Sequence, residues 1–402
     1  MIIKSIYLQN YKSFKKTFVE LEKFNVLLGN NSTGKSNFLS VFSFLDLVIR
    51  FSTRSAILST YGGSEFFPNI NIDPTKMNTI IKLDILTDYN VSYSNKKYDK
   101  KFEVNINKTE YELEVEFSKN RKEFNIVKDL VTQSFQIFDR KNKIQLLSGS
   151  LSMRNDSGKG LKIEGMDVTD ANFKDMIPLP KEEYFIEEFL KQLFSKKSKK
   201  SKIVYPILDS RYLSYSSCIY DVLSEVLKNK ERRRKFRNIL GDLLNNSNIA
   251  DNVVKLFAKK HDEQDNTYYD DEYRKNTVIS QLQSFSDGTI SAIVLIIALV
   301  FNKNPLILIR DIEKNIYPYN IPSIMDLVQD VLVHDKRKQI FVNTNSPLVI
   351  DSEVVKPENV LMFKTNKDGF TTIEKLDQKE EFIKDFLNGD LTLFDYIQMN
   401  RF

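Results

Sequence analysis

Cysteine, histidine and long hydrophobic runs are scarce in this sequence. Its 402 residues include one cysteine, Cys218, and two histidines. A single cysteine excludes an internal disulfide framework and is typical of a reducing compartment. The longest apolar run, residues 290–301, is interrupted by Ser291 and is too short to span a bilayer. The N-terminus lacks the apolar core of a signal peptide. We therefore expect a cytoplasmic protein without a membrane partner.

The histidines give no sign of a metal site, and the overall charge leaves nucleic-acid binding open. His261 and His334 lack the spacing of metal ligands, so each is interpreted as an ordinary surface residue. No histidine cluster of a nuclease and no acidic domain of the Toprim type is evident in the sequence. The net charge of +5 permits nucleic-acid binding without requiring it. The length suits two or three domains.

The stretch Gly29–Ser36 fits the pattern G-x-x-x-x-G-K-[ST] of a phosphate-binding loop. An apolar strand is expected over residues 24–28 before it, and an apolar helix to about residue 50 after it. In this arrangement the amides at the helix N-terminus point at a phosphate, Lys35 reaches the β- and γ-phosphates, and the Ser36 hydroxyl holds Mg²⁺. A chance glycine-rich turn is the alternative. The expected nucleotide-binding residues are Asn30, Asn31, Ser32, Thr33, Gly34, Lys35, Ser36 and Asn37.

Hydrophobic periodicity predicts an α/β fold. Residues 3–28 alternate as strands, and residues 80–125 predict an antiparallel sheet of short strands with polar outer faces, continued more weakly to residue 168. From residue 290 a long apolar helix, two continuous apolar strands and an amphipathic helix indicate a parallel sheet covered on both faces. Further elements are expected as a helix over 182–194, a strand over 203–208, helices over 218–244, an acidic loop over 261–272, apolar strands over 305–309 and 339–343, a helix over 321–332, and a hairpin over 360–373.

This periodicity, together with the phosphate loop and the motifs described below, predicts four segments of the chain. Residues 1–60 hold the N-terminal half of an ATPase domain with its phosphate loop, and residues 61–202 are a β-rich and helical insertion that ends in a basic linker. Residues 203–280 form a helical subdomain. Residues 281–402 carry the C-terminal half of the ATPase domain.

Three further motifs follow the phosphate loop in the order of one ATPase class. Residues 284–289, SFSDGT, open the long apolar helix, and residues 305–318, PLILIRDIEKNIYP, form an apolar strand followed by acidic residues and a proline. Residues 339–351, QIFVNTNSPLVID, form another strand. With the opening element 6–14, IYLQNYKSF, these motifs resemble the ABC-class AAA ATPases of the OLD/RecF/SMC-like type, over about residues 1–50 and 280–375. The resemblance implies an ABC-type ATPase head with a mixed sheet, interrupted by an insertion.

The resemblance implies ATP and Mg²⁺ as cofactors and a composite site between subunits. The segment 284–289 is similar to the signature motif, so Ser286, Asp287 and Gly288 would face the γ-phosphate of a nucleotide held by a second subunit. A common turn or helix cap is the alternative for this motif. The expected assembly is a homodimer or a higher even-numbered oligomer.

The sequence departs from the family pattern where hydrolysis is catalysed. When Glu313 and Pro318 are aligned with the family's E-x-x-x-x-P pattern, Arg310 stands where the family has the Mg²⁺-linked aspartate. Asp311 then stands where the family has the catalytic glutamate. In the other register Asp311 is the metal-linked aspartate, and Ile312 replaces the base. Asn345 replaces the switch histidine. The candidate catalytic residues are Asp311, Glu313 and Asn345, and the candidate metal ligands are Ser36 and Asp311.

These departures predict ATP binding with slow hydrolysis. Aspartate is one methylene shorter than glutamate, and a displacement of about 1 Å costs about 10²-fold in rate. In the expected dimer, Arg310 at the end of a core strand beside the phosphates would also neutralise phosphate charge, so that binding would depend less on Mg²⁺. The family's glutamine-bearing loop is missing or altered, because no glutamine lies between Gln9 and Gln133.

Three functional hypotheses follow. The first is a dimeric ATPase that acts as sensor or scaffold for a separate effector, a nuclease or toxin, in defence against phage. The second is an interaction protein for which nucleotide is a fixed cofactor. The third is a DNA-binding repair ATPase that contacts phosphates through Lys196–Lys202 and Arg232–Lys235. Solvated charged surfaces are the alternative for both basic runs. Arg211 is a candidate contact for nucleotide or partner, or a surface ion pair.

Overall fold

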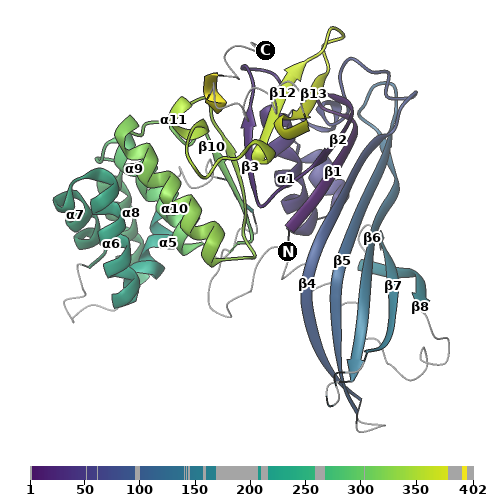
Figure 1. Cartoon of the computed structure of the whole chain (residues 1–402), viewed down its shortest axis with the longest axis horizontal. Coiled ribbons are helices and arrows are strands. Elements are labelled where there is room, and N and C mark those ends of the chain that lie inside the picture. The colour runs from purple at the N-terminus through teal and green to yellow at the C-terminus, as the bar shows by residue number, and fades with distance from the viewer. Residues whose placement is uncertain are drawn as a thin grey trace.

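The computed structural model contains two β-sheets and a group of helices, which lie side by side (Figure 1). It describes residues 2–50, 52–60, 62–95, 100–139, 141, 143, 145–156, 160–168, 207–209, 216–258, 268–302, 304–378 and 392–395. The predicted α/β class is confirmed. The basic run 196–202, Arg211, His261 and the helix expected over 182–194 lie outside the described residues.

The larger sheet is antiparallel and has seven strands in the order β2-β1-β4-β5-β6-β7-β8. Alternate residues of β5 and β6, such as Val104 and Ile106 or Phe135 and Ile137, are buried, as expected for a sheet with one polar face. Several strands are longer than the short runs that the sequence predicted. The strands are β1 (Ile2–Tyr11), β2 (Phe14–Glu20), β4 (Thr79–Asn95), β5 (Lys100–Phe117), β6 (Phe124–Asp139), β7 (Gln145–Asp156) and β8 (Gly160–Val168).

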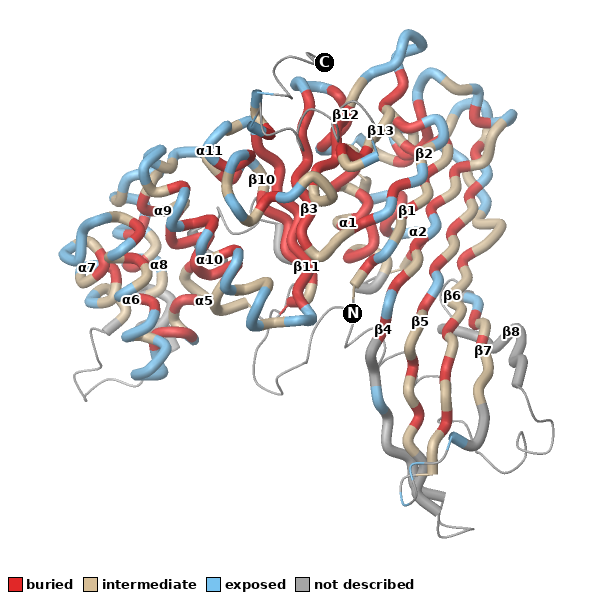
Figure 2. The backbone as a smooth tube through the Cα atoms, viewed as in Figure 1, coloured by how far each residue is buried: buried red, intermediate tan, exposed pale blue. Residues whose placement is uncertain are grey.

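The smaller sheet has the order β13-β12-β3-β11-β10-β9 and is parallel except for β13. Its central strands β3 and β11 are buried along their whole length, and buried residues concentrate in this sheet (Figure 2). The predicted parallel sheet and terminal hairpin are both present. The strands are β3 (Phe24–Leu28), β9 (Ile207–Asp209), β10 (Leu306–Arg310), β11 (Gln339–Asn343), β12 (Val360–Thr365) and β13 (Thr371–Lys375).

Successive residues of the smaller sheet enter two different hydrophobic clusters, because neighbouring side chains of a strand point to opposite faces. On one face, Val26 and Val342 join a cluster with the helices from α5 to α10. On the other, Leu27 and Phe341 join α1 and the larger sheet. The sheet is therefore covered on both sides, and its strand ends are left to form a site.

The helices are α1 (Lys35–Arg50), α2 (Thr53–Leu58), α5 (Ser216–Lys228), α6 (Lys230–Leu244), α7 (Ser247–Ala258), α8 (Tyr268–Leu282), α9 (Asp287–Ile296), α10 (Ile321–His334) and α11 (Pro347–Ile350). A π-helical turn, Ile297–Phe301, extends α9. The loop predicted over 261–272 is wrong in its second part, because α8 begins at Tyr268. Its first turn is built from polar and aromatic residues without an apolar stripe, so periodicity gave no helical signal.

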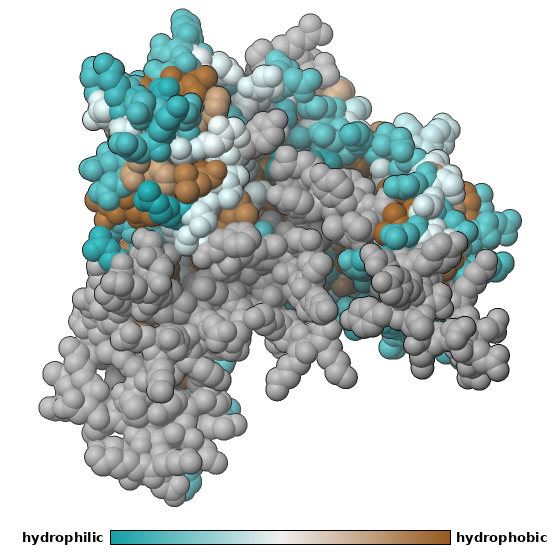
Figure 3. Space-filling view, turned by 180° about the vertical axis from the view of Figure 1, so that it is seen from behind, coloured by the Kyte–Doolittle hydropathy of each residue, from teal (hydrophilic) through white to brown (hydrophobic). Residues whose placement is uncertain are grey.

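The surface of the described residues is mainly hydrophilic, and hydrophobic residues appear in separate areas rather than one broad face (Figure 3). No single described helix is long and apolar enough to cross a membrane. Helical segments Lys275–Leu282 and Asp287–Phe301 are long and apolar enough only when they are taken together, and they are bent by 116° relative to each other.

Candidate functional site

The phosphate loop connects the carboxyl end of β3 to the N-terminus of α1, as the sequence predicts. Gly29 and Gly34 have φ values of +149° and +101°, in the region that favours glycine. A Cβ atom at Gly34 would lie 2.8 Å from the Ser13 hydroxyl, and one at Gly29 would meet the carbonyl of Phe363. Both glycines are therefore required by backbone conformation and by space.

Lys35 is only 7% exposed and lies along its own loop. Its Nζ donates hydrogen bonds to the carbonyls of Gly29 and Asn30, the latter at 2.9 Å. Burial lowers the pKa of Lys35, and the nearby negative charge of Asp311 opposes this shift. The ammonium is therefore bonded to the loop carbonyls and is close enough to Asp311 to be affected by its charge.

The other predicted nucleotide-binding residues surround this lysine. Thr33 is buried and its hydroxyl donates to the carbonyl of Asn30 at 2.8 Å, which closes the loop. Asn37 is partly buried. The exposed members, which a ligand can reach, are Asn30, Asn31, Ser32 and Ser36. The first turn of α1 contains no acidic residue, so its partial positive charge is left for an anion.

Two residues that sequence reasoning did not assign to the site brace the loop. The Thr371 hydroxyl is 2.9 Å from the Thr33 carbonyl and 2.9 Å from the Ser13 hydroxyl. Asn37 Nδ2 also donates to Ser13 at 2.9 Å. Ser13 belongs to the N-terminal element that resembles the family pattern, but Thr371 lies in a hairpin whose sequence carries no sign of this role.

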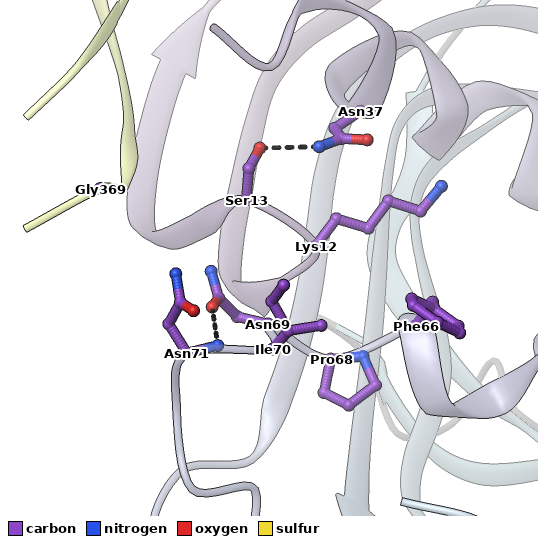
Figure 4. A pocket seen from close by; sticks show the side chains of 9 residues that line it. All are labelled: Lys12, Ser13, Asn37, Phe66, Pro68, Asn69, Ile70, Asn71 and Gly369. Carbon is purple, nitrogen blue, oxygen red and sulfur yellow. Dashed lines mark hydrogen bonds between the residues drawn. The ribbon is translucent and has the colours of Figure 1, made fainter. Parts of the chain in front are cut away.

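A pocket of about 400 Å³ lies beside the loop (Figure 4). The β1–β2 turn and α1 contribute polar side chains to its wall. The segment after α2 contributes both apolar and amide side chains. The residues that line it are Lys12, Ser13, Asn37, Phe66, Pro68, Asn69, Ile70, Asn71 and Gly369.

The acidic side of the site lies at the carboxyl ends of β10 and β11. Arg310 is the last residue of β10 and is paired in register with Asn343, which is paired in turn with Leu27 of β3. Asp311 follows with a φ of +49° and is exposed. Asn343 Nδ2 donates to Asp311 Oδ1 at 2.9 Å, and the backbone N–H of Ile312 donates to the Asn343 carbonyl.

Glu313 is engaged with the switch segment. Its Oε2 accepts from the Thr344 hydroxyl at 2.8 Å, and its Oε1 accepts from the Asn345 backbone N–H at 2.9 Å. The structure thus brings the three candidate catalytic residues to neighbouring loops. Of the two carboxylates, Glu313 holds the backbone of Asn345 in place, whereas Asp311 is exposed.

The signature-like motif caps α9. The Ser286 hydroxyl accepts from the Thr289 N–H at 3.2 Å, which is an N-cap. A Cβ atom at Gly288 would lie 2.8 Å from the Asn315 carbonyl, so the helix end is in contact with the loop that follows β10. Ser286 and Asp287 are exposed.

The basic cluster Arg232–Lys235 lies in the first half of α6. Three of its members are exposed, whereas Arg233 is partly buried and donates to the Leu227 carbonyl at 2.7 Å. His334 is exposed at the end of α10, within hydrogen-bond distance of the Asp330 carbonyl. The described residues contain no cluster of three or more histidine, cysteine or acidic side chains that would hold a metal ion by themselves.

Solved structures with some similarity to the chain include three SMC head domains. The head domain from Thermotoga maritima has 14% identity and a TM-score of 0.39, and covers 93% of this chain and 99% of its own. An SmcHead bound to the C-winged helix domain of ScpA has 14% identity and a TM-score of 0.41, with coverage of 96% and 100%. An Smc head with an extended coiled coil, bound to the C-terminal domain of ScpA derived from Pyrococcus furiosus, has 13% identity, a TM-score of 0.36 and coverage of 96% and 99%.

Curated proteins provide no match. A family model described as "AAA domain, putative AbiEii toxin, Type IV TA system" matches residues 24–351. This range contains the phosphate loop, the signature-like motif and both strands of the acidic side. Because the match spans well over half of the chain, this protein belongs to that family of AAA-domain P-loop ATPases.

Proposed function

We propose that the protein binds ATP with Mg²⁺ and hydrolyses it slowly. The observation that supports binding most directly is the loop itself, with two glycines in positive φ, Lys35 beside it and a helix N-terminus free of acidic residues. Backbone amides and a lysine are the groups that hold the phosphates in P-loop proteins. Ser36 and Asp311 supply oxygen atoms of the kind that Mg²⁺ prefers.

The pocket beside the loop suits the nucleoside part of the ligand. It shares Ser13 and Asn37 with the brace of the phosphate loop. Its volume and its mixture of amide and apolar side chains are typical of small-molecule sites. In this proposal the phosphates follow the loop while the ribose and base lie between the β1–β2 turn and the segment that contains Phe66.

Slow hydrolysis is supported by the hydrogen bonds of the two carboxylates, Glu313 and Asp311. Both oxygens of Glu313 accept hydrogen bonds from the switch segment, so this residue acts as a support of Thr344 and Asn345. Asp311 is then the acid available to orient a water molecule, and it is shorter than the glutamate of the family pattern. A general base contributes about 10²- to 10⁴-fold, so a misplaced base leaves a slow enzyme.

A homodimer is supported by the exposed surface around Ser286. The loop that touches Gly288 carries Tyr317 and Tyr319, which are 64% and 80% exposed and have ring centroids 5.3 Å apart. Aromatic side chains are enriched at interfaces, and these two lie on the loop that contacts the exposed N-terminus of α9. We propose that Ser286 of one subunit faces the nucleotide bound to Lys35 of the other, related by two-fold symmetry.

The dimer would serve as a sensor or scaffold for a separate effector, a nuclease or toxin, in defence against phage. The family description names a toxin and a TA system, which agrees with such a setting but does not identify this chain's partner. The exposed basic residues Arg232, Arg234 and Lys235 of α6 support the alternative of a DNA-binding ATPase, whose affinity would fall with salt.

The test of the proposed function combines equilibrium binding and turnover. We expect the purified chain to bind ATP and to hydrolyse it well below the typical range of about 1–10³ s⁻¹. A folded protein that binds no ATP would overturn the proposal. A salt-dependent affinity for duplex DNA that is lost on replacing Arg232, Arg234 and Lys235 with serine would favour the alternative role.

A further inference from the structure

The end of β10 carries a positive charge, Arg310, which in one of the two registers stands where the family pattern has a metal-linked acid. The residue paired with it on β11 is Asn343. Asp311, which follows Arg310, is then the carboxylate left at this strand end to bind a magnesium ion.

Asn343 is a polar residue at the end of an otherwise apolar stretch of strand. It is 8% exposed and follows Ile340, Phe341 and Val342. Its Nδ2 donates to Asp311 Oδ1 at 2.9 Å. Because an ionised carboxylate only accepts hydrogen bonds, this contact fixes the orientation of the amide, with the nitrogen toward Asp311 and the oxygen away from it.

The amide oxygen of Asn343 has no hydrogen-bond partner among the described residues, although it is shielded from solvent. Burying a carbonyl without a partner is destabilising, so the side chain brings a cost to the fold that its bond to Asp311 only partly offsets. The bond to Asp311 is therefore the contact that accounts for a polar residue at this place.

We propose that Asn343 positions Asp311 as the carboxylate that binds Mg²⁺, and this inference rests on the proposed binding of Mg²⁺ with ATP. Its amide nitrogen donates to Asp311 Oδ1 and so holds this exposed carboxylate in one orientation. Mg²⁺ in phosphate sites is held by one or two carboxylates and keeps several waters, and residues that orient such ligands tune its affinity.

The proposal predicts how nucleotide affinity depends on the metal. Asn343→Leu keeps the shape of the side chain but removes both polar groups. We expect wild type to bind a non-hydrolysable ATP analogue more tightly with Mg²⁺ than with EDTA. In Asn343→Leu the affinity with Mg²⁺ should fall about tenfold, while the affinity in EDTA stays unchanged. Asn343→Asp should retain or increase the dependence on metal.

Calorimetric titration with Mg²⁺ or EDTA measures these affinities, and Mn²⁺ bound to the protein–nucleotide complex, followed by electron paramagnetic resonance, reports the ion directly. Thermal unfolding of each variant checks the fold, and Asn343→Ala takes the place of Asn343→Leu where leucine prevents folding. Arg310→Asp placed in the Asn343→Leu background should restore the metal dependence.

Equal metal dependence in wild type and Asn343→Leu would overturn the inference but leave ATP binding intact. Equal wild-type affinity with Mg²⁺ and EDTA would also overturn it, and would favour charge neutralisation by Arg310 alone. A wild type that binds no nucleotide in either condition would instead overturn the proposed function. The two failures are therefore distinguishable.

Discussion

The carboxyl ends of β3 and β10, which lie on either side of β11 in the smaller sheet, differ in the side chains that they provide to the site. The carboxyl end of β3 carries a loop in which both glycines have positive φ and Thr371, Ser13 and Asn37 brace the backbone. The carboxyl end of β10 carries Arg310 and Asp311, and the nearby Glu313 is engaged in holding another segment. In the proposed function, the groups that hold phosphate and the groups that cleave it therefore reside in separate parts of the fold.

Replacement of Lys35 by alanine should give the largest effect, because it removes the charged group of the β3 side. Hydrogen bonds to charged groups contribute about 1.5–3 kcal/mol, so ATP affinity should fall about 10- to 100-fold or become unmeasurable. Equilibrium binding measures this loss. Lys314→Ala, which removes an exposed lysine, is the matched control. Unchanged affinity in folded Lys35→Ala would break the assignment of the phosphate side.

The two carboxylates of the β10 side should respond differently to loss of charge. We expect Asp311→Asn to reduce the remaining hydrolysis about 10- to 100-fold, because the carboxylate that orients the water is lost. ATP affinity should fall with Mg²⁺ but not in EDTA, because the same carboxylate is the proposed metal ligand. Glu313→Gln keeps one acceptor for the switch segment and should have a smaller effect on the rate. Single-turnover hydrolysis separates these variants. A larger loss in Glu313→Gln than in Asp311→Asn would reverse the roles of the two acids.

Ser286→Arg tests whether the motif around Ser286 faces a nucleotide that is bound to the phosphate loop of a second chain. The bulky cation at the N-cap should block the proposed sandwich and prevent ATP-dependent dimerisation, while ATP binding by the monomer changes little. Sedimentation with and without ATP follows the assembly. Because Ser286 is exposed, the cost to folding should be limited to loss of the cap, about 1 kcal/mol. Normal dimerisation of this variant, or a wild type that stays monomeric at every ATP concentration, would exclude the sandwich.

The smallest effect on ATP binding is expected at the opposite end of β11, where a substitution should change stability but not the chemistry of the site. Lys338 is 5% exposed, its Nζ donates to the Leu299 carbonyl at 2.7 Å, and burial lowers its pKa to about 8. Asp335 opposes this shift, whereas Arg337 and Lys235 add to it. Between pH 8 and the usual lysine pKa the unfolded chain binds more protons, so raising the pH favours the folded state.

The free energy of unfolding of wild type should therefore rise by up to about 3 kcal/mol between pH 8 and 10.5, relative to that of Lys338→Met. Denaturant unfolding of both proteins across this range measures the difference, and ATP affinity serves as the control that should not differ between them at pH 7.5. A difference between the two proteins that is constant with pH would show that Lys338 titrates at its ordinary value.

The sequence predicts the central elements well because their signals are local. The strand β3, the helix α1, the strands β10 and β11 and the final hairpin each follow from apolar runs bounded by glycine, proline or polar residues. Strand lengths in the larger sheet were underestimated, since one polar face interrupts the apolar pattern. The order of strands depends on contacts across more than 300 residues, which no local pattern specifies.

The candidate site is predictable where a motif fixes backbone shape and less so where side chains meet from distant segments. Gly34 and Lys35 follow from the loop pattern. Asn343 and Thr371 do not, because each acts through a partner on another strand, Asp311 in one case and Thr33 in the other. The engagement of both oxygens of Glu313 likewise appears only when β10 and β11 are placed side by side.

The hydrogen bond from Thr371 to the carbonyl of Thr33 has a consequence for the order in which the chain is made. The phosphate loop leaves the ribosome early, but the strands on both sides of β3 come from residues 339–343 and 360–365, and its brace comes from residue 371. Long-range pairings form late because they wait for distant chain. A nascent or truncated chain that stops before residue 371 thus carries the complete loop sequence without the strands and the side chain that hold it in place.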